Sequence, residues 1–142
     1  MQKLSKAVLI LALIIAAGNA YAGPEETAIS NMLVRMFDKP ESRLEVGPVV
    51  VSGDHAIADW AQGEMGGRAL LRRRHNEWSI VLCAGDQIKA QDAMIKAGVP
   101  ASDASRLSSG LASAEALLDP NQRASFSRFE GLVMMEHDSN HH

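Results

Sequence analysis

Apolar residues in the stretch PEETAISNMLVRMFDKP, which begins at Pro24, recur with the period of an α-helix. They fall at i, i+3, i+4, i+7 and i+8 and so share one side of a helix: Ile29, Met32, Leu33, Met36 and Phe37. Pro24 suits the first turn of a helix, and Pro40 cannot continue one. The pattern predicts an amphipathic helix between these two prolines, with both methionines filling the core.

The chain then changes to short runs rich in β-branched and aromatic residues. The runs are RLEVGPVVV, HAIADWAQGE, GRALLRRRH and EWSIVLCAG, separated by turn-forming residues at 52–54, 66–67 and 75–77. Such short connections join only antiparallel neighbours, because parallel strands need a long crossover. We therefore predict a four-stranded antiparallel meander. Its fourth run is apolar on both faces and is expected to be covered on both sides, whereas the charges in RALLRRR predict a less buried strand.

Helical patterns return after residue 85. Asp86 can cap a helix from about Gln87 to Ala97, which Gly98 closes. A second helix is predicted from apolar residues at i, i+4, i+7 and i+11: Leu107, Leu111, Ala114 and Leu118. Asp119 and Pro120 predict the cap and first residue of a third, short helix.

Together these elements predict an α+β fold. An N-terminal helix leads into the four-stranded antiparallel meander, and the C-terminal helices pack on the sheet. The run LVMM at residues 132–135 can add an edge strand. A helix followed by a curled antiparallel sheet is also the outline of the cystatin-like and NTF2-like folds, which is a likeness of fold alone.

The first 22 residues predict where the protein works. Lys3 and Lys6 precede an apolar run of about 11 residues, and Ala20-Tyr21-Ala22 fits the small-x-small cleavage rule. A helix needs roughly 20 apolar residues to cross a bilayer, so this run predicts a removable signal peptide. We expect a periplasmic product with three parts: a cleaved signal at 1–22, a single domain at 23–131 and a Met/His-rich C-terminal tail at 132–142.

Charge and cysteine content narrow the choice of partners. Without residues 1–22 the chain has 12 basic and 17 acidic residues, a net charge of −5. This balance argues against nucleic acid as a partner, in spite of the run Arg72–Arg74.

No segment after the leader is apolar enough to predict a membrane span. The single cysteine, Cys83, cannot form an internal disulfide, so the fold depends on its core.

Candidate catalytic residues are few. His55, in a predicted turn, and His75, at a strand end, do not suggest an oriented base. Asp59 in AIADWA can act as a base in a cavity, but alternation along the strand favours an outward position. The sequence has no Gly-rich phosphate loop, HExxH or CxxC motif. We therefore predict a protein that is not an enzyme, with a candidate pocket around four residues: Trp60, Trp78, Asp59 and Cys83.

The end of the chain, LVMMEHDSNHH, carries the most marked metal chemistry. Thioethers prefer Cu(I), and imidazoles suit Cu(II) and Zn(II). Two thioethers and three imidazoles lie within the last nine residues: Met134, Met135, His137, His141 and His142. A solvated tail that binds nothing explains the same composition, since ordering a flexible segment around an ion costs conformational entropy.

Several motifs resemble a known family. The pieces DWAQG, GGRALLRR and W-x-I-V-L-C-x-G-D, followed by AGVP and an Ala/Ser-rich helix, resemble the copper uptake system-associated proteins, which are small exported bacterial proteins. The likeness spans most of the chain, from Phe37 to Phe129. It implies an accessory role in periplasmic copper handling, with copper-transport proteins of the same system as partners. It supplies no ligand set, so the candidate copper ligands remain the five residues of the C-terminal segment, with Cys83 a weaker candidate.

Three functions are open at this point. The first is a copper-handling accessory that binds the ion through its C-terminal Met/His segment. The second is a protein-binding or small-ligand-binding module with an apolar pocket near Trp60 and Trp78 and an inert tail. The third is a cavity enzyme, which requires that Asp59 faces a pocket with a raised pKa.

Overall fold

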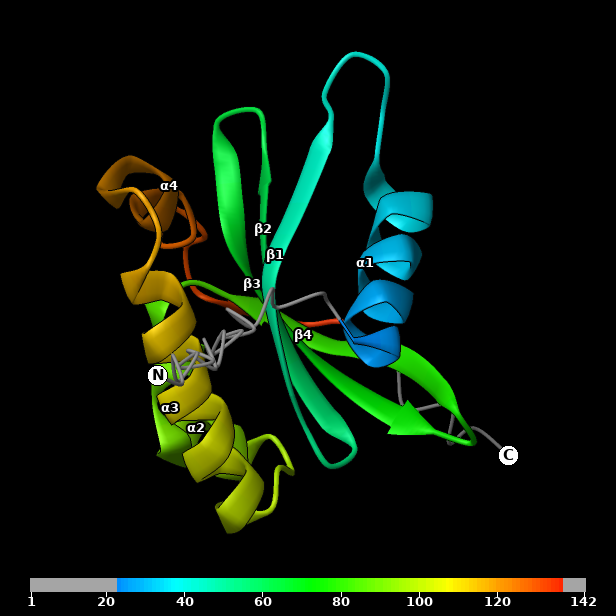
Figure 1. Ribbon diagram of the computed structural model, residues 1–142, viewed down its shortest axis with the longest axis vertical. Helices are drawn as coiled ribbons and strands as arrows, with labels where there is room; N and C mark the ends of the chain where they lie inside the picture. The colour runs from blue at the N-terminus through cyan, green and yellow to red at the C-terminus, as the bar shows by residue number, and fades with distance from the viewer. Residues whose placement is uncertain (1–22, 137–142) are drawn as a thin grey trace, which may run out of the picture.

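The structure is a computed structural model that describes residues 23–136. The predicted signal peptide, residues 1–22, lies outside the described residues, as do three predicted copper ligands: His137, His141 and His142. The predicted α+β class is confirmed (Figure 1). Helix α1, Pro24–Phe37, leads into an antiparallel sheet, and further helices follow.

The sheet is a meander of five strands rather than four. The strand order in the sheet follows the chain, and every neighbouring pair is antiparallel. The strands are β1 Leu44–Ser52, β2 His55–Gln62, β3 Met65–Arg74, β4 Glu77–Ala84 and β5 Leu132–Met134. The fifth strand comes from the LVMM run, which pairs with the free edge of β4 and so extends the sheet into the predicted tail.

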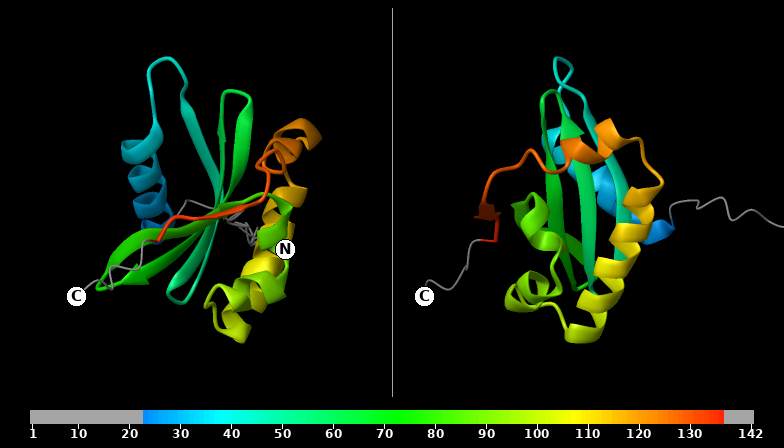
Figure 2. Two further views of the ribbon diagram at one scale, coloured as in Figure 1. Left: turned by 180° about the vertical axis from the view of Figure 1, so that it is seen from behind. Right: turned by 90° about the vertical axis from the view of Figure 1, so that its left-hand side faces the viewer.

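Helices cover both faces of the sheet, which gives three layers (Figures 1 and 2). Helix α1 lies on one face, and the helices that follow β4 lie on the other: η1 Asp86–Lys89, α2 Gln91–Lys96 and α3 Ala101–Ala116. The last helix, α4 Pro120–Ser125, contacts β3. Each face has its own buried core, with Ile29 and Leu33 of α1 in one and Leu107 and Leu111 of α3 in the other.

Strand β3 is among the most deeply buried elements, so the prediction of a less buried strand is wrong. Ala69, Leu70 and Leu71 are at most 1% exposed, and Arg68 is 1% exposed. A strand with neighbours on both sides and helices over both faces has no solvent side, whatever its charges suggest. The arginine run 72–74 falls at the end of β3, where the cover stops.

The helices after β4 agree only in part with the sequence pattern. Two short helices, η1 and α2, replace the single predicted helix. Asp86 does not cap a helix as predicted. It is the first residue of η1, and its carboxylate accepts hydrogen bonds from Arg68 at 3.0 Å and Ser127 at 2.5 Å instead. Gly98 closes α2 with a φ of +103°, and Asp119 caps α4 through a backbone N–H of its first turn, both as predicted.

The glycine pair Gly66-Gly67 does not form the turn predicted for it. The turn lies earlier, at Gly63, whose φ is +59°. A Cβ on Gly66 would lie 2.2 Å from the carbonyl oxygen of Ser125, and a Cβ on Gly67 would lie 2.9 Å from the Cβ of Phe129. The two glycines therefore let the end of α4 and the segment that follows it lie close against β3.

Candidate functional site: an apolar pocket beside α1

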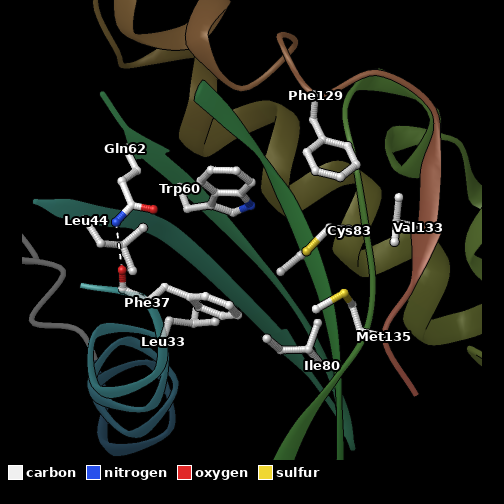
Figure 3. Close-up of a pocket in the computed structure, with 11 residues that line it drawn as sticks. Leu33, Phe37, Leu44, Trp60, Gln62, Ile80, Cys83, Phe129, Val133 and Met135 are labelled. Atoms are coloured by element: carbon white, nitrogen blue, oxygen red, sulfur yellow. Dashed lines mark hydrogen bonds between the residues drawn. The ribbon is translucent and has the colours of Figure 1, made fainter. Parts of the chain in front are cut away.

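The sheet face on which α1 packs against β1 also contains an apolar pocket. We name this hollow the α1 pocket; its volume is about 300 Å³. Its lining is Leu33, Phe37, Leu44, Trp60, Gln62, Ala69, Ile80, Cys83, Phe129, Val133 and Met135 (Figure 3). A groove adjoins it, which we name the methionine groove: Met32, Met36, Trp78, Ser79, Ile80, Met135 and Glu136.

The apolar lining follows from alternation along the strands. The register pairs Trp60 with Gly67 and Ala69 with Cys83, so side chains of three neighbouring strands stand on one face. Trp60 meets Phe129 edge to face, with ring centroids 6.1 Å apart and planes at 77°. Phe129 belongs to the segment that crosses over β3 and closes one end of the pocket (Figure 3).

Polar contacts hold α1 in place at both ends of the helix. At its start, the Glu25 carboxylate accepts a hydrogen bond from the Trp78 indole N–H at 2.8 Å and pairs with Arg73. At its end, the Gln62 amide donates to the carbonyl oxygens of Phe37 and of the following loop, at 2.7 and 2.8 Å. These contacts fix the position of α1, which contributes Leu33 and Phe37 to the lining of the pocket.

Cys83 lies in the wall of the α1 pocket as an uncharged thiol. Burial raises the pKa of the Cys83 thiol to about 11, so the thiolate that a nucleophile requires is scarce at neutral pH. Among the described residues, no charged or imidazole side chain lines this pocket. The hollow is thus suited to holding a ligand rather than to acid–base chemistry.

The two methionines of the predicted metal segment lie on opposite sides of the sheet. Met134 is 56% exposed at the end of β5, whereas Met135 lines both the α1 pocket and the methionine groove. The Met135 backbone N–H donates to the Val81 carbonyl oxygen at 2.8 Å. The next residue, Glu136, pairs with Arg72 at 2.6 Å. These two contacts fix Met135 at the rim of the pocket.

The outward position predicted for Asp59 is wrong. Asp59 does point away from Trp60, but α3 covers that face, and its side chain is 0% exposed. It lies opposite Arg68 in the register, with Arg68 Nε 3.7 Å from Asp59 Oδ1. Arg68 Nε also donates to Glu115 Oε1 at 2.8 Å. We name this group, with Asp86, the Arg68 cluster.

Burial raises the pKa of Asp59 to about 9, and the negative charge of Glu115 adds to the shift. Burial alone would also raise the pKa of Glu115, but the hydrogen bonds from Asp59 and Arg68 and the Arg68 charge hold it below its usual value. At neutral pH Asp59 is therefore protonated and uncharged, and the positive charge of Arg68 is paired with the ionised carboxylate of Glu115. A cavity enzyme would require that Asp59 has a raised pKa and faces a pocket. Asp59 has the raised pKa, but it lines neither the α1 pocket nor the methionine groove.

The structure thus brings together part of the predicted site. Trp60 and Cys83 line the α1 pocket, Trp78 lines the methionine groove, and Met135 lines both. The prediction missed seven apolar lining residues: Leu33, Phe37, Leu44, Ala69, Ile80, Phe129 and Val133. Their apolar character was visible in the sequence, but nothing local distinguished a wall of a cavity from an ordinary core.

Two properties of residues 23–136 bear on metal ions and membranes. In this part of the chain, no three His, Cys, Asp or Glu side chains form a group that could hold a metal ion. Nor does any helix there have the length and apolar character to cross a bilayer.

No family model, curated protein or solved structure matches this chain significantly.

Proposed function

We propose that this protein is a non-catalytic, exported binding protein that holds a small apolar ligand in the α1 pocket. The observation that supports this most directly is an apolar hollow of about 300 Å³ beside a helix that polar contacts hold at both ends. Small-molecule sites span roughly 300–1,000 Å³, so the ligand is at the small end of that range. The predicted leader favours action in the periplasm.

The pocket suits a single aromatic ring or a short acyl chain. Burying roughly 150–250 Å² of apolar ligand surface gains roughly 4–6 kcal/mol at about 25 cal/mol per Å². The loss of translational and rotational freedom offsets part of that gain. We therefore expect dissociation constants of roughly 0.1–1 mM or weaker for single-ring ligands.

Filling the pocket from β5 is expected to weaken ligand binding. In Val133→Phe the added ring projects into the α1 pocket from an exposed edge strand, so the fold is spared while the ligand volume is lost. We expect toluene, followed by backbone amide NMR shifts, to bind the variant at least about tenfold more weakly, a change of ~1.4 kcal/mol.

Leu132→Phe is the matched control, because Leu132 is the preceding residue of the same strand and points to the other face. Its toluene binding is expected to equal that of the unchanged protein. Equal effects of the two substitutions, or shifts confined to residues outside the α1 pocket, would place the ligand elsewhere.

An accessory role in periplasmic copper handling is the second candidate, with copper-transport proteins of the same system as partners. It is favoured by one observation: Met135, a predicted copper ligand, lines the same pocket as the Cys83 thiol. The resemblance carried by DWAQG and GGRALLRR supports the same role. This candidate requires that the purified protein binds copper, and a protein that binds none would exclude it.

A further inference from the structure

We propose that the wall of the α1 pocket holds a site for a monovalent soft ion, Cu(I), formed by the Cys83 thiolate and the Met135 thioether. The inference rests on the copper-handling candidate and names the residues that carry it. It places the copper ligands on strand β4 and just after strand β5, instead of in the C-terminal Met/His segment.

The antiparallel register brings the two sulfur-bearing side chains together. Val133 of β5 pairs with Cys83 of β4, and Met135 lies two residues further on, on the same face. Side chains in this diagonal relation have Cβ atoms roughly 7–8 Å apart or less, which a long side chain can span. Cys83 and Met135 both line the α1 pocket and lie on the same wall of it (Figure 3).

The chemistry of these donors selects the ion. Thiolate and thioether sulfur prefer Cu(I), whereas Mg²⁺ and Ca²⁺ require several oxygen ligands, and Gln62 supplies the one side-chain oxygen among the residues that line the α1 pocket. When the ion binds, the Cys83 proton leaves to solvent, and one thiolate with one monovalent cation forms a neutral pair. A divalent ion would leave a net positive charge in an apolar hollow, which is costly. The pocket therefore favours a monovalent ion.

The surroundings leave both sulfur atoms available and give the ion a route to them. The Cys83 thiol is free and makes no hydrogen bond within residues 23–136. The methionine groove meets the pocket at Met135 and adds two thioethers from α1, Met32 and Met36. Met36, predicted as core, is 57% exposed, so a soft ligand stands at the open end of the groove.

The test is an anaerobic titration of the purified full chain with Cu(I) against a chromophoric Cu(I) chelator, repeated with Ag⁺. We expect one Cu(I) per chain and thiolate-to-copper charge-transfer absorption in the near ultraviolet. Cys83→Val, Cys83→Ser and Met135→Leu are each expected to weaken Cu(I) binding at least tenfold, and both Cys83 variants are expected to lose the absorption. Two Cys83 variants are used because one of them could disturb the fold.

Met65→Leu is the matched control, since Met65 is an exposed methionine at the start of β3 that lines neither the α1 pocket nor the methionine groove. It is expected to bind Cu(I) as the unchanged protein does. If Cys83→Val and Met135→Leu bind normally and removal of residues 137–142 abolishes binding, this inference is overturned while the copper-handling candidate stands. If the unchanged protein binds no Cu(I), both fail.

Discussion

Replacing Arg68 with methionine is expected to lower the free energy of unfolding by about 3–5 kcal/mol. The Arg68 guanidinium is 1% exposed and donates two hydrogen bonds to charged partners, Glu115 at 2.8 Å and Asp86 at 3.0 Å. Methionine occupies similar space but leaves the Glu115 carboxylate, which is only 3% exposed, without its counter-charge. An uncompensated buried charge is what makes the loss of one partner costly.

Urea unfolding followed by tryptophan fluorescence measures this effect. Arg74→Met is the control, because Arg74 is exposed at the end of the same strand, and we expect a change within about 0.5 kcal/mol. Adding Glu115→Leu to Arg68→Met removes both charges and is expected to recover most of the loss. An Arg68→Met protein as stable as Arg74→Met would show that the Arg68 cluster does not support the fold.

Stability is expected to fall as pH rises from 7 to 8.5, and Asp59→Asn is expected to remove most of that dependence. The pKa of Asp59 is about 9 in the folded protein against 3.8 in the unfolded chain. The folded state therefore holds one more proton between these values, and its stability decreases with rising pH by at most about 1.4 kcal/mol per pH unit. Asparagine keeps the shape and the hydrogen-bonding capacity without an ionisable group.

Within the pH window Asp59 is the main titrating group. The Cys83 thiol adds a smaller decrease near pH 8.5, because its pKa is 9.0 in the unfolded chain and about 11 in the folded protein. Burial lowers the pKa of His55 from 6.5, so His55 is mostly neutral in both states above pH 7 and affects stability mainly at lower pH. The lowered pKa of Glu115 gives stability that is lost only as pH falls below about 4.5. Urea unfolding at several pH values measures the slope. Asp92→Asn, at an exposed position of α2, is expected to keep the slope of the unchanged protein, and an unaltered slope in Asp59→Asn would contradict the assignment.

Both predictions depend on residues whose partners come from distant parts of the chain. Asp59 and Arg68 lie in the sequence motifs DWAQG and GGRALLRR. Their partner Glu115 lies 47 residues beyond Arg68, so no local motif links it to them. Alternation correctly separates Asp59 from Trp60 onto opposite faces. It cannot show that α3 covers the Asp59 face, so the outward prediction was wrong and the cluster was missed.

The candidate site was predictable to a similar extent. Trp60 and Cys83 belong to the predicted pocket and line it, because aromatic and small apolar residues on neighbouring strands share a face. Val133 and Met135 belong to the LVMM run, which can add an edge strand at the start of a Met/His-rich tail, but no local pattern shows which strand it pairs with or that it lines a pocket. The pairing of β5 with β4 makes them part of the pocket.

By itself, the sequence determines the α+β class, the first helix and the antiparallel meander, because helical periodicity and turn residues act within a few residues of one another. The tertiary structure alone decides that both faces of the sheet are covered, that Asp59 is buried with Arg68, and that Cys83 and Met135 share a pocket. Those outcomes depend on contacts between residues roughly 50 positions apart, and the free energy of such contacts comes from the burial of whole surfaces, which no local pattern encodes.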